Sequence, residues 1–154
     1  MNSTQAIHEL MVEIGPILDL QQVTEYAEDS AWLLVCDDET RIDAEYDQAN
    51  ERLMLTGDVA VVAEHARAKV YEALLQYNYL WTEHGGVRAA LDASQGMVVL
   101  MFELQVAALD ISRLSSVLLN VREVVEGWRR ILASIEAGGD GADVIHPAPG
   151  MVRV

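Results

Sequence analysis

The stretch LLQYNYLWTEHGGVRAALDASQGMVVL, residues 74–100, decides the fold because it predicts a helix, a glycine turn and two strands in succession. LLQYNYLW lies near the end of a helix predicted over 60–83. Gly85 and Gly86 follow, and glycine readily adopts the left-handed backbone that closes a helix. Two strands are predicted next, over 87–92 and 97–104, joined by Ala93-Ser94-Gln95-Gly96.

The predicted helix over 60–83 is apolar around much of its girth. One stripe at helical spacing consists of Val70, Leu74, Tyr77 and Trp81. A second stripe beside it consists of Tyr71, Leu75 and Asn78. A helix with two apolar stripes needs more than one surface to bury it. The sequence therefore predicts a partner for this helix beyond its own sheet.

The rest of the chain supplies the sheet and two further helices. A helix over Thr4–Ile14 is expected to stop at Gly15-Pro16, and 17–23 is read as a loop or strand edge. Strands are predicted over 31–37, 40–47 and 52–56, the last ended by Gly57-Asp58, and short connections indicate an antiparallel meander. A final helix begins near Asp110, a good N-cap.

This element order, helix-βββ-helix-ββ-helix, predicts an α+β fold with an antiparallel sheet covered by helices. Residues 1–137 are expected to form a single domain. The Gly-, Ala- and Pro-rich segment 138–154 shows no periodicity, and we expect a flexible tail there.

Composition narrows the classes of function. The 154 residues are 51% hydrophobic yet carry a formal net charge of −15, which suits a chain that keeps an apolar surface soluble through dimerisation or client binding. That charge argues against a nucleic-acid partner, which would require clustered Lys and Arg. No export signal and no apolar run long enough for membrane insertion are visible, and the single Cys36 fits a reducing cytoplasm.

The side chains that usually carry chemistry form no recognisable set. His8, His65, His84 and His146 are scattered without metal-ligand spacing, so no metal or other cofactor is expected. Cys36 falls within a predicted strand and is expected to be a buried thiol rather than a nucleophile. The acidic turn at 37–39 lacks the glycine and ligand spacing of a calcium loop. The sequence therefore predicts no enzymatic activity.

Three stretches carry a family resemblance: LLVCDD (33–38), LLQYNYLW with GGVRAALDASQGMVVL (74–100), and ALDISRLSSVLLNVREVVEGWRRIL (108–132). With the small size and acidic balance, they resemble the type III secretion chaperones of the Tir chaperone (CesT-like) family over about residues 5–135. The third strand departs from the family's apolar-proline-glycine continuation, reading Leu55-Thr56-Gly57-Asp58 instead. The start of the second helix is therefore left open.

The resemblance implies a cytoplasmic bacterial homodimer that binds the N-terminal segment of a secreted effector and keeps it soluble and secretion-competent, without catalysis. It implies that the dimer joins through the second helix and the following strand. The expected interface residues are Tyr71, Leu75, Asn78, Tyr79, Val87, Ala89 and Leu91. The expected client-binding residues, on the first helix and first strands, are Leu10, Ile14, Leu18, Trp32, Leu34, Ile42, Ala44 and Tyr46.

Two alternatives remain open at this point. One is a small α+β ligand-binding domain or enzyme whose pocket is lined by Tyr and Trp, which would form a stable monomer with a closed pocket. The other is an acidic regulatory adaptor on the same fold that binds a folded partner.

Overall fold

The sheet at the centre of the fold has six strands, all paired antiparallel in the order β1-β2-β3-β4-β6-β5. The computed structural model describes residues 2–139. In chain order the helices and strands are α1 (Ser3–Ile17), β1 (Gln22–Tyr26), β2 (Ala31–Val35), β3 (Arg41–Asp47), β4 (Arg52–Val61), α2 (Arg67–Tyr79), β5 (Arg88–Asp92), β6 (Met97–Gln105) and α3 (Ile111–Glu136). The predicted α+β fold with an antiparallel sheet is confirmed.

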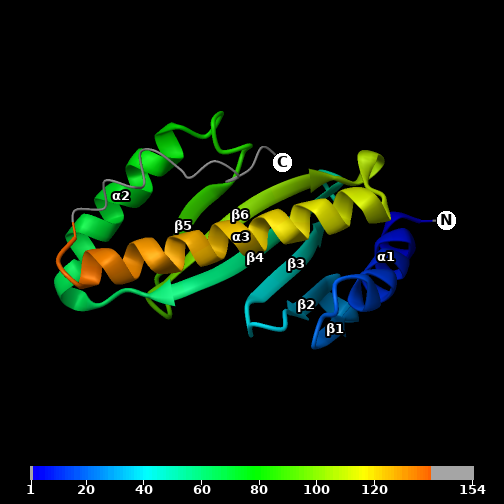
Figure 1. The fold of residues 1–154 in the computed structure, drawn as a ribbon. Coiled ribbons are helices and arrows are strands. Elements are labelled where there is room, and N and C mark those ends of the chain that lie inside the picture. Colours follow the sequence, from blue (N-terminus) through cyan, green and yellow to red (C-terminus); the bar gives the residue numbers. More distant parts are fainter. Residues whose placement is uncertain (1, 140–154) are drawn as a thin grey trace.

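The helices cover one face of the sheet from end to end. In Figure 1, α3 runs along the middle strands, α1 lies at the β1 end and α2 at the β5 end. Side chains alternate accordingly: Ile42 and Ala44 of β3 are buried beneath the helices, whereas Arg41 and Asp43 on the opposite face are exposed. Strands β1 and β5 form the two edges of the sheet.

Helix α3 lies very close to β4 because one position of that strand has no side chain. A Cβ atom built on Gly57 would lie 2.9 Å from Cγ2 of Val125 and 3.2 Å from Cγ1 of Val121, both on α3. The helix begins where the sequence predicts, with Oδ1 of its N-cap Asp110 accepting a hydrogen bond from the Arg113 amide at 2.7 Å. The glycine thus permits the backbone of β4 to approach the buried stripe of α3.

Arg129 of α3 fixes the irregular part of β4 beside this contact. The pairing of β4 with β6 shifts register between Asp58 and Ala60, a β-bulge that turns backbone carbonyls out of the ladder. Arg129 donates from Nε to the Val59 carbonyl at 2.9 Å and from Nη2 to the Asp58 carbonyl at 3.1 Å. Its Nη1 donates to Oγ1 of the fully buried Thr40 at 2.9 Å. One side chain therefore holds α3, the bulge and the start of β3 together.

Several boundaries differ from the sequence predictions. Strand β4 does not end at Gly57-Asp58 but continues to Val61, because the glycine serves a close contact and the bulge replaces a turn. Helix α2 consequently begins at Arg67 rather than near residue 60, and it ends at Tyr79 rather than near residue 83. Strand β1 begins at Gln22, inside the segment 17–23 that was read as a loop or strand edge, and runs to Tyr26, so four strands precede α2 instead of three.

Helix α1 passes through Gly15-Pro16 and ends at Ile17, contrary to the predicted stop. A proline in the last turn removes only one helical hydrogen bond, and the Leu18 amide still donates to the Ile14 carbonyl at 3.0 Å. Gly15 is buried against β1, where an added Cβ would lie 3.3 Å from Cγ2 of Val23. The glycine therefore serves helix-to-strand packing rather than helix termination.

The predicted flexible tail, 138–154, falls outside the described residues from 140 onward. It stays a prediction.

We expect Gly57→Ala to lower the free energy of unfolding by about 1–3 kcal/mol, since the new methyl group overpacks the contact with Val125. Chemical denaturation of the single variants and of the double variant Gly57→Ala/Val125→Ala measures this. The double variant should lose less stability than the sum of the two single losses, because Val125→Ala removes the crowded methyl groups. Full additivity would show that Gly57 is not a packing constraint.

Candidate functional site

An apolar hollow of about 690 Å³ runs along the outer side of α2. Its lining comprises Ala68, Tyr71, Glu72, Leu75, Gln76, Tyr79 and Leu80. Leu75 is 71% exposed and Tyr79 85% exposed, unusual values for large apolar and aromatic side chains on a helix of a folded domain. Contiguous apolar surface of this kind marks an interaction site. We call the exposed Leu75 and Tyr79, with the half-buried Tyr71 and the other residues that line the hollow, the α2 face.

The expected dimer-interface residues divide into two groups. Leu91, on the edge strand β5, is exposed like Leu75 and Tyr79, and Tyr71 is half-buried. The other three expectations are corrected, because Val87 and Ala89 are buried in the chain's own core. Asn78 is used within the chain too: its Nδ2 donates to the Ala89 carbonyl and its Oδ1 accepts from the Ala89 amide, both at 2.8 Å. These contacts dock α2 on β5.

Trp81 was expected on a helical stripe with buried partners, but α2 ends before it and its side chain is 53% exposed. A ligand pocket lined by Tyr and Trp, one of the alternatives from the sequence, would enclose such side chains. Tyr79 and Trp81 instead stand at the surface, so the structure favours an interface over an enclosed pocket.

The expected client-binding residues require correction as well. Six of the eight are buried in the core, namely Ile14, Trp32, Leu34, Ile42, Ala44 and Tyr46. The residues on the strands alternate because every second side chain faces the helices. These side chains pack against other core residues and are therefore not free to bind a client. Only Leu10 and Leu18 remain half-buried at the margin of the core.

A second hollow, of about 590 Å³, lies between the end of α1 and the edge strand β1. It is lined by Val12, Gly15, Pro16, Asp19, Leu20, Gln21, Gln22 and Val23. Val12 is 62% exposed, and Ile17 at the end of the same helix is 50% exposed. We call this hollow with the free edge of β1 the α1–β1 groove. The short, polar segment QVTEY lacks a clear strand pattern, so this groove is not predictable from the sequence.

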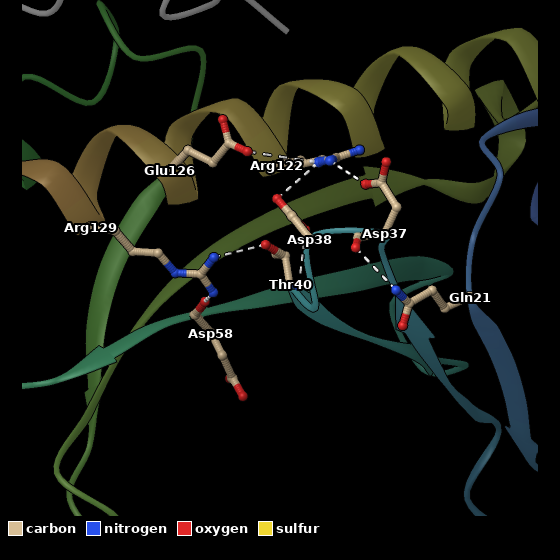
Figure 2. A network of polar contacts seen from close by, with 8 residues as sticks. All are labelled: Gln21, Asp37, Asp38, Thr40, Asp58, Arg122, Glu126 and Arg129. Carbon is tan, nitrogen blue, oxygen red and sulfur yellow. Dashed lines mark hydrogen bonds and ion pairs between the residues drawn. The ribbon is translucent and has the colours of Figure 1, made fainter.

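A polar network links α3, the turn between β2 and β3, and Gln21 at the margin of this groove (Figure 2). Nε of Arg122, on α3, donates to Oδ2 of Asp38 at 3.2 Å, and its Nη2 pairs with Asp37 in the β2–β3 turn. The Thr40 amide donates to Oδ1 of Asp38 at 3.0 Å, and Gln21, just before β1, donates to the Asp37 carbonyl at 3.0 Å. The turn is thereby tied both to α3 and to the start of β1.

This network also sets the charge of Asp38. Burial acts to raise the pKa of Asp38, but hydrogen bonds from Thr40, Glu126 and Arg122 outweigh it and lower that pKa to about 2. The pKa of Glu126 is raised, first by its hydrogen bond to Asp38 and then by burial. Asp38 is therefore ionised at neutral pH, as its pairing with Arg122 requires.

Asp38→Asn tests the network. Because the folded-state pKa of Asp38 lies below its ordinary value, its stabilisation is present above about pH 4 and is lost as the pH falls toward 2. After allowing for solvent screening, we expect the variant to be less stable by about 1 kcal/mol at neutral pH and to match the wild type near pH 2.

Urea denaturation at both pH values measures this difference. The control is Asp37→Asn, whose side chain is 63% exposed and which should change the stability by less than about 0.5 kcal/mol. Equal losses for Asp37→Asn and Asp38→Asn, or a loss that persists near pH 2, would contradict the assignment.

The described residues offer no other obvious chemistry. Within 2–139, no three His, Cys, Asp or Glu side chains come together in a way that could hold a metal ion. Cys36 is buried as predicted, and burial raises the pKa of its thiol, which disfavours the nucleophilic thiolate. None of the helices in this part of the chain combines the length and apolarity needed to cross a bilayer.

Comparison with known proteins places this arrangement among chaperones. The family model described as the Tir chaperone protein (CesT) family matches residues 9–129. Among the curated proteins, no sequence matches the chain.

Several solved structures are similar at low sequence identity. The ExsC–ExsE complex contains a chain with a TM-score of 0.74 and 23% identity, covering 86% of this chain and 97% of that one. A chain of the HopA1–SchA chaperone–effector complex has a TM-score of 0.66 and 18% identity, and the match covers 83% of this chain and 96% of that one. A chain of the ExoU–SpcU complex from the type III secretion system of Pseudomonas aeruginosa has a TM-score of 0.53 and 18% identity, and the match covers 80% of this chain and 95% of that one. These likenesses establish the fold.

Proposed function

Because the chain belongs to the Tir chaperone protein (CesT) family, we propose that it is a cytoplasmic bacterial chaperone for a type III secreted effector. It binds the N-terminal segment of the effector and keeps that protein soluble and secretion-competent. The observation that carries the proposal is the α1–β1 groove, where apolar side chains lie beside a strand with one unpaired edge. The similar folds of the HopA1–SchA and ExoU–SpcU complexes support the same class of partner.

The groove fits an extended segment for a physical reason. An edge strand presents unpaired backbone N–H and C=O groups, so an added strand gains hydrogen bonds along β1. Alternate side chains of that segment would then lie over Val12, Leu20 and Val23. Ordering a flexible client costs conformational entropy, and apolar burial at roughly 25 cal/mol per Å² offsets it. Because apolar burial and backbone hydrogen bonds would supply most of the affinity, that affinity should depend little on salt.

We propose further that the α2 face joins two copies of the chain. Leu75 and Tyr79 project from the same side of α2, and Leu91 is exposed on the adjoining edge strand β5. A two-fold interface brings the same patch of each copy together, so both apolar surfaces are buried at once. Glu72 is the one acidic side chain in the lining of this hollow. The second surface that the helix needs is then its counterpart in the other subunit.

Val12→Asp and Ile17→Asp test the client site. Both side chains are largely exposed in the free chain, so the substitutions should leave the fold intact. We expect Val12→Asp to weaken binding of the N-terminal segment of the co-encoded effector at least tenfold, since a charge would have to be desolvated in the groove. Ile17 lies at the end of the same helix but outside the lining of the groove, so Ile17→Asp should have a smaller effect. Isothermal titration calorimetry measures the affinity, and the wild type should show a negative heat-capacity change.

The matched control for these variants is Val61→Asp, at a position on β4 that is 57% exposed and does not line the groove. It should bind like the wild type. If Val12→Asp binds like the wild type, the client lies on another face.

Leu75→Asp and Tyr79→Asp test the dimer. Each should convert a dimer into a monomer at micromolar concentration without lowering the melting temperature of the chain appreciably, because both side chains are exposed in the monomer. Light scattering measures the mass. The control Leu119→Asp, on α3 and 47% exposed, should remain dimeric. A wild-type protein of monomer mass at that concentration would rule out the proposed interface.

A further inference from the structure

The loop 80–87, which joins α2 to β5, is built around a buried histidine. His84 is only 3% exposed, and its ring stacks on Tyr77 of α2 with centroids 3.9 Å apart and planes inclined by 13°. Tyr77 in turn meets the ring of Trp128, on α3, edge-on at 5.1 Å. The imidazole therefore continues an aromatic stack that runs from α3 through α2 to the loop.

This imidazole has an unsatisfied nitrogen. Among the described residues, Nε2 of His84 is buried without a hydrogen-bond partner. A neutral imidazole can leave one nitrogen unpaired at a moderate cost, whereas an imidazolium carries a charge and donates from both nitrogens. The site therefore accepts the neutral form and opposes the protonated one.

The surroundings of the ring favour the neutral imidazole on balance. Burial lowers the pKa of His84, and the negative charge of Glu83, its neighbour in the loop, opposes this to a smaller extent. From α2 and α3 the ring stack presents Tyr77 and Trp128, and burial raises the pKa of Tyr77 to about 12 against the effect of its hydrogen bond with Trp128, so both are neutral. The tyrosine face attracts a cation, but the lost hydration of a buried charge is the larger effect.

The backbone of the loop depends on this anchor. The Val87 amide donates to the His84 carbonyl at 3.2 Å, and the Gly86 amide donates to the Trp81 carbonyl at 3.1 Å. Gly85 and Gly86 both have positive φ, 63° and 88°. Glycine adopts positive and negative φ about equally readily, so these residues do not favour the turn by themselves. These hydrogen bonds join residues of the loop to one another, so the loop is anchored to the rest of the chain by the stacked ring of His84 and, at its end, by the buried Val87.

We propose that His84 is a pH-sensitive latch: the neutral imidazole holds loop 80–87 on Tyr77, and protonation in mildly acidic solution releases the loop. Release disorders the segment that carries Trp81 and follows Tyr79 at the border of the α2 face. The latch thereby loosens the association of two copies in acid. This last consequence rests on the proposed dimer, whereas the release of the loop does not.

The sign of the effect follows from linkage. Above about pH 6.5, the ordinary pKa of histidine, His84 is neutral whether the loop is closed or open, so pH has no effect through this residue. Below that value the open form binds a proton that the closed form resists. The opening equilibrium should therefore rise up to about tenfold per pH unit until the closed form is protonated as well.

Amide hydrogen exchange at Gly86 and Val87 between about pH 8 and 5 tests the latch, after correction for the intrinsic pH dependence of exchange. In the wild type, the opening equilibrium at these amides should rise as the pH falls below about 6.5. His84→Phe keeps an aromatic ring on Tyr77 but cannot be protonated, and its opening should not respond to pH. His65→Gln, which removes an exposed histidine before α2, should respond like the wild type.

Several results would overturn the proposal. One is the same acid response in His84→Phe as in the wild type, and another is no response in the wild type. If His84→Phe does not fold, nuclear magnetic resonance titration of the wild-type imidazole decides: a pKa at or above the ordinary value overturns the latch. Light scattering over the same pH range separates the two proposals, because a dimer that persists while Val87 exchange accelerates overturns only the link to dimerisation.

Discussion

The close approach of α3 to β4 is the constraint on which the rest of the structure depends. Gly57 removes the side chain that would separate them, and Arg129 then bonds the carbonyls of Asp58 and Val59 at the bulge. The same guanidinium reaches Thr40 at the start of β3. The close contact at Gly57 and the hydrogen bonds beside it thus hold the central helix, β4 and the start of β3 together, within the longer buried stripe of α3.

This arrangement leaves the two edges of the sheet for binding. Because α3 covers the middle strands, α1 and α2 can each lie at one end of the sheet, beside β1 and β5 respectively (Figure 1). The α1–β1 groove and the α2 face are therefore at opposite ends of the chain's sheet. A client held at one end and a second copy at the other would not compete for the same surface. This separation is the physical basis for assigning them different partners.

The sequence predicts well those features that depend on local pattern. The alternation of Ile42, Ala44 and Tyr46, the N-cap Asp110 and the apolar girth of the second helix all lead to correct elements. The second apolar stripe predicted on this helix includes Tyr71 and Leu75, and both line the hollow on α2; that this face joins two copies stays a proposal. The family resemblance is confirmed by the match over residues 9–129.

Features that depend on tertiary contact were not predictable in this way. Glycine commonly marks the end of a helix or strand, so Gly15 and Gly57 suggest element ends in the sequence. Only the close approach of a neighbouring element shows that they serve packing. An alternating strand reveals which side chains share a face but not whether a helix or a client covers that face. For this reason the sequence suggests Trp32 and Ile42 as client-binding residues, whereas both lie in the core. The groove itself depends on β1, whose five residues carry little apolar signal.

The most direct test of the account is amide hydrogen exchange on the chain with and without the N-terminal segment of the co-encoded effector. The account predicts that binding slows exchange at the amides of β1, residues 22–26, while the amides of β5, the opposite edge, keep their rates. Binding that protects β5 and leaves β1 unchanged would contradict the proposed client site.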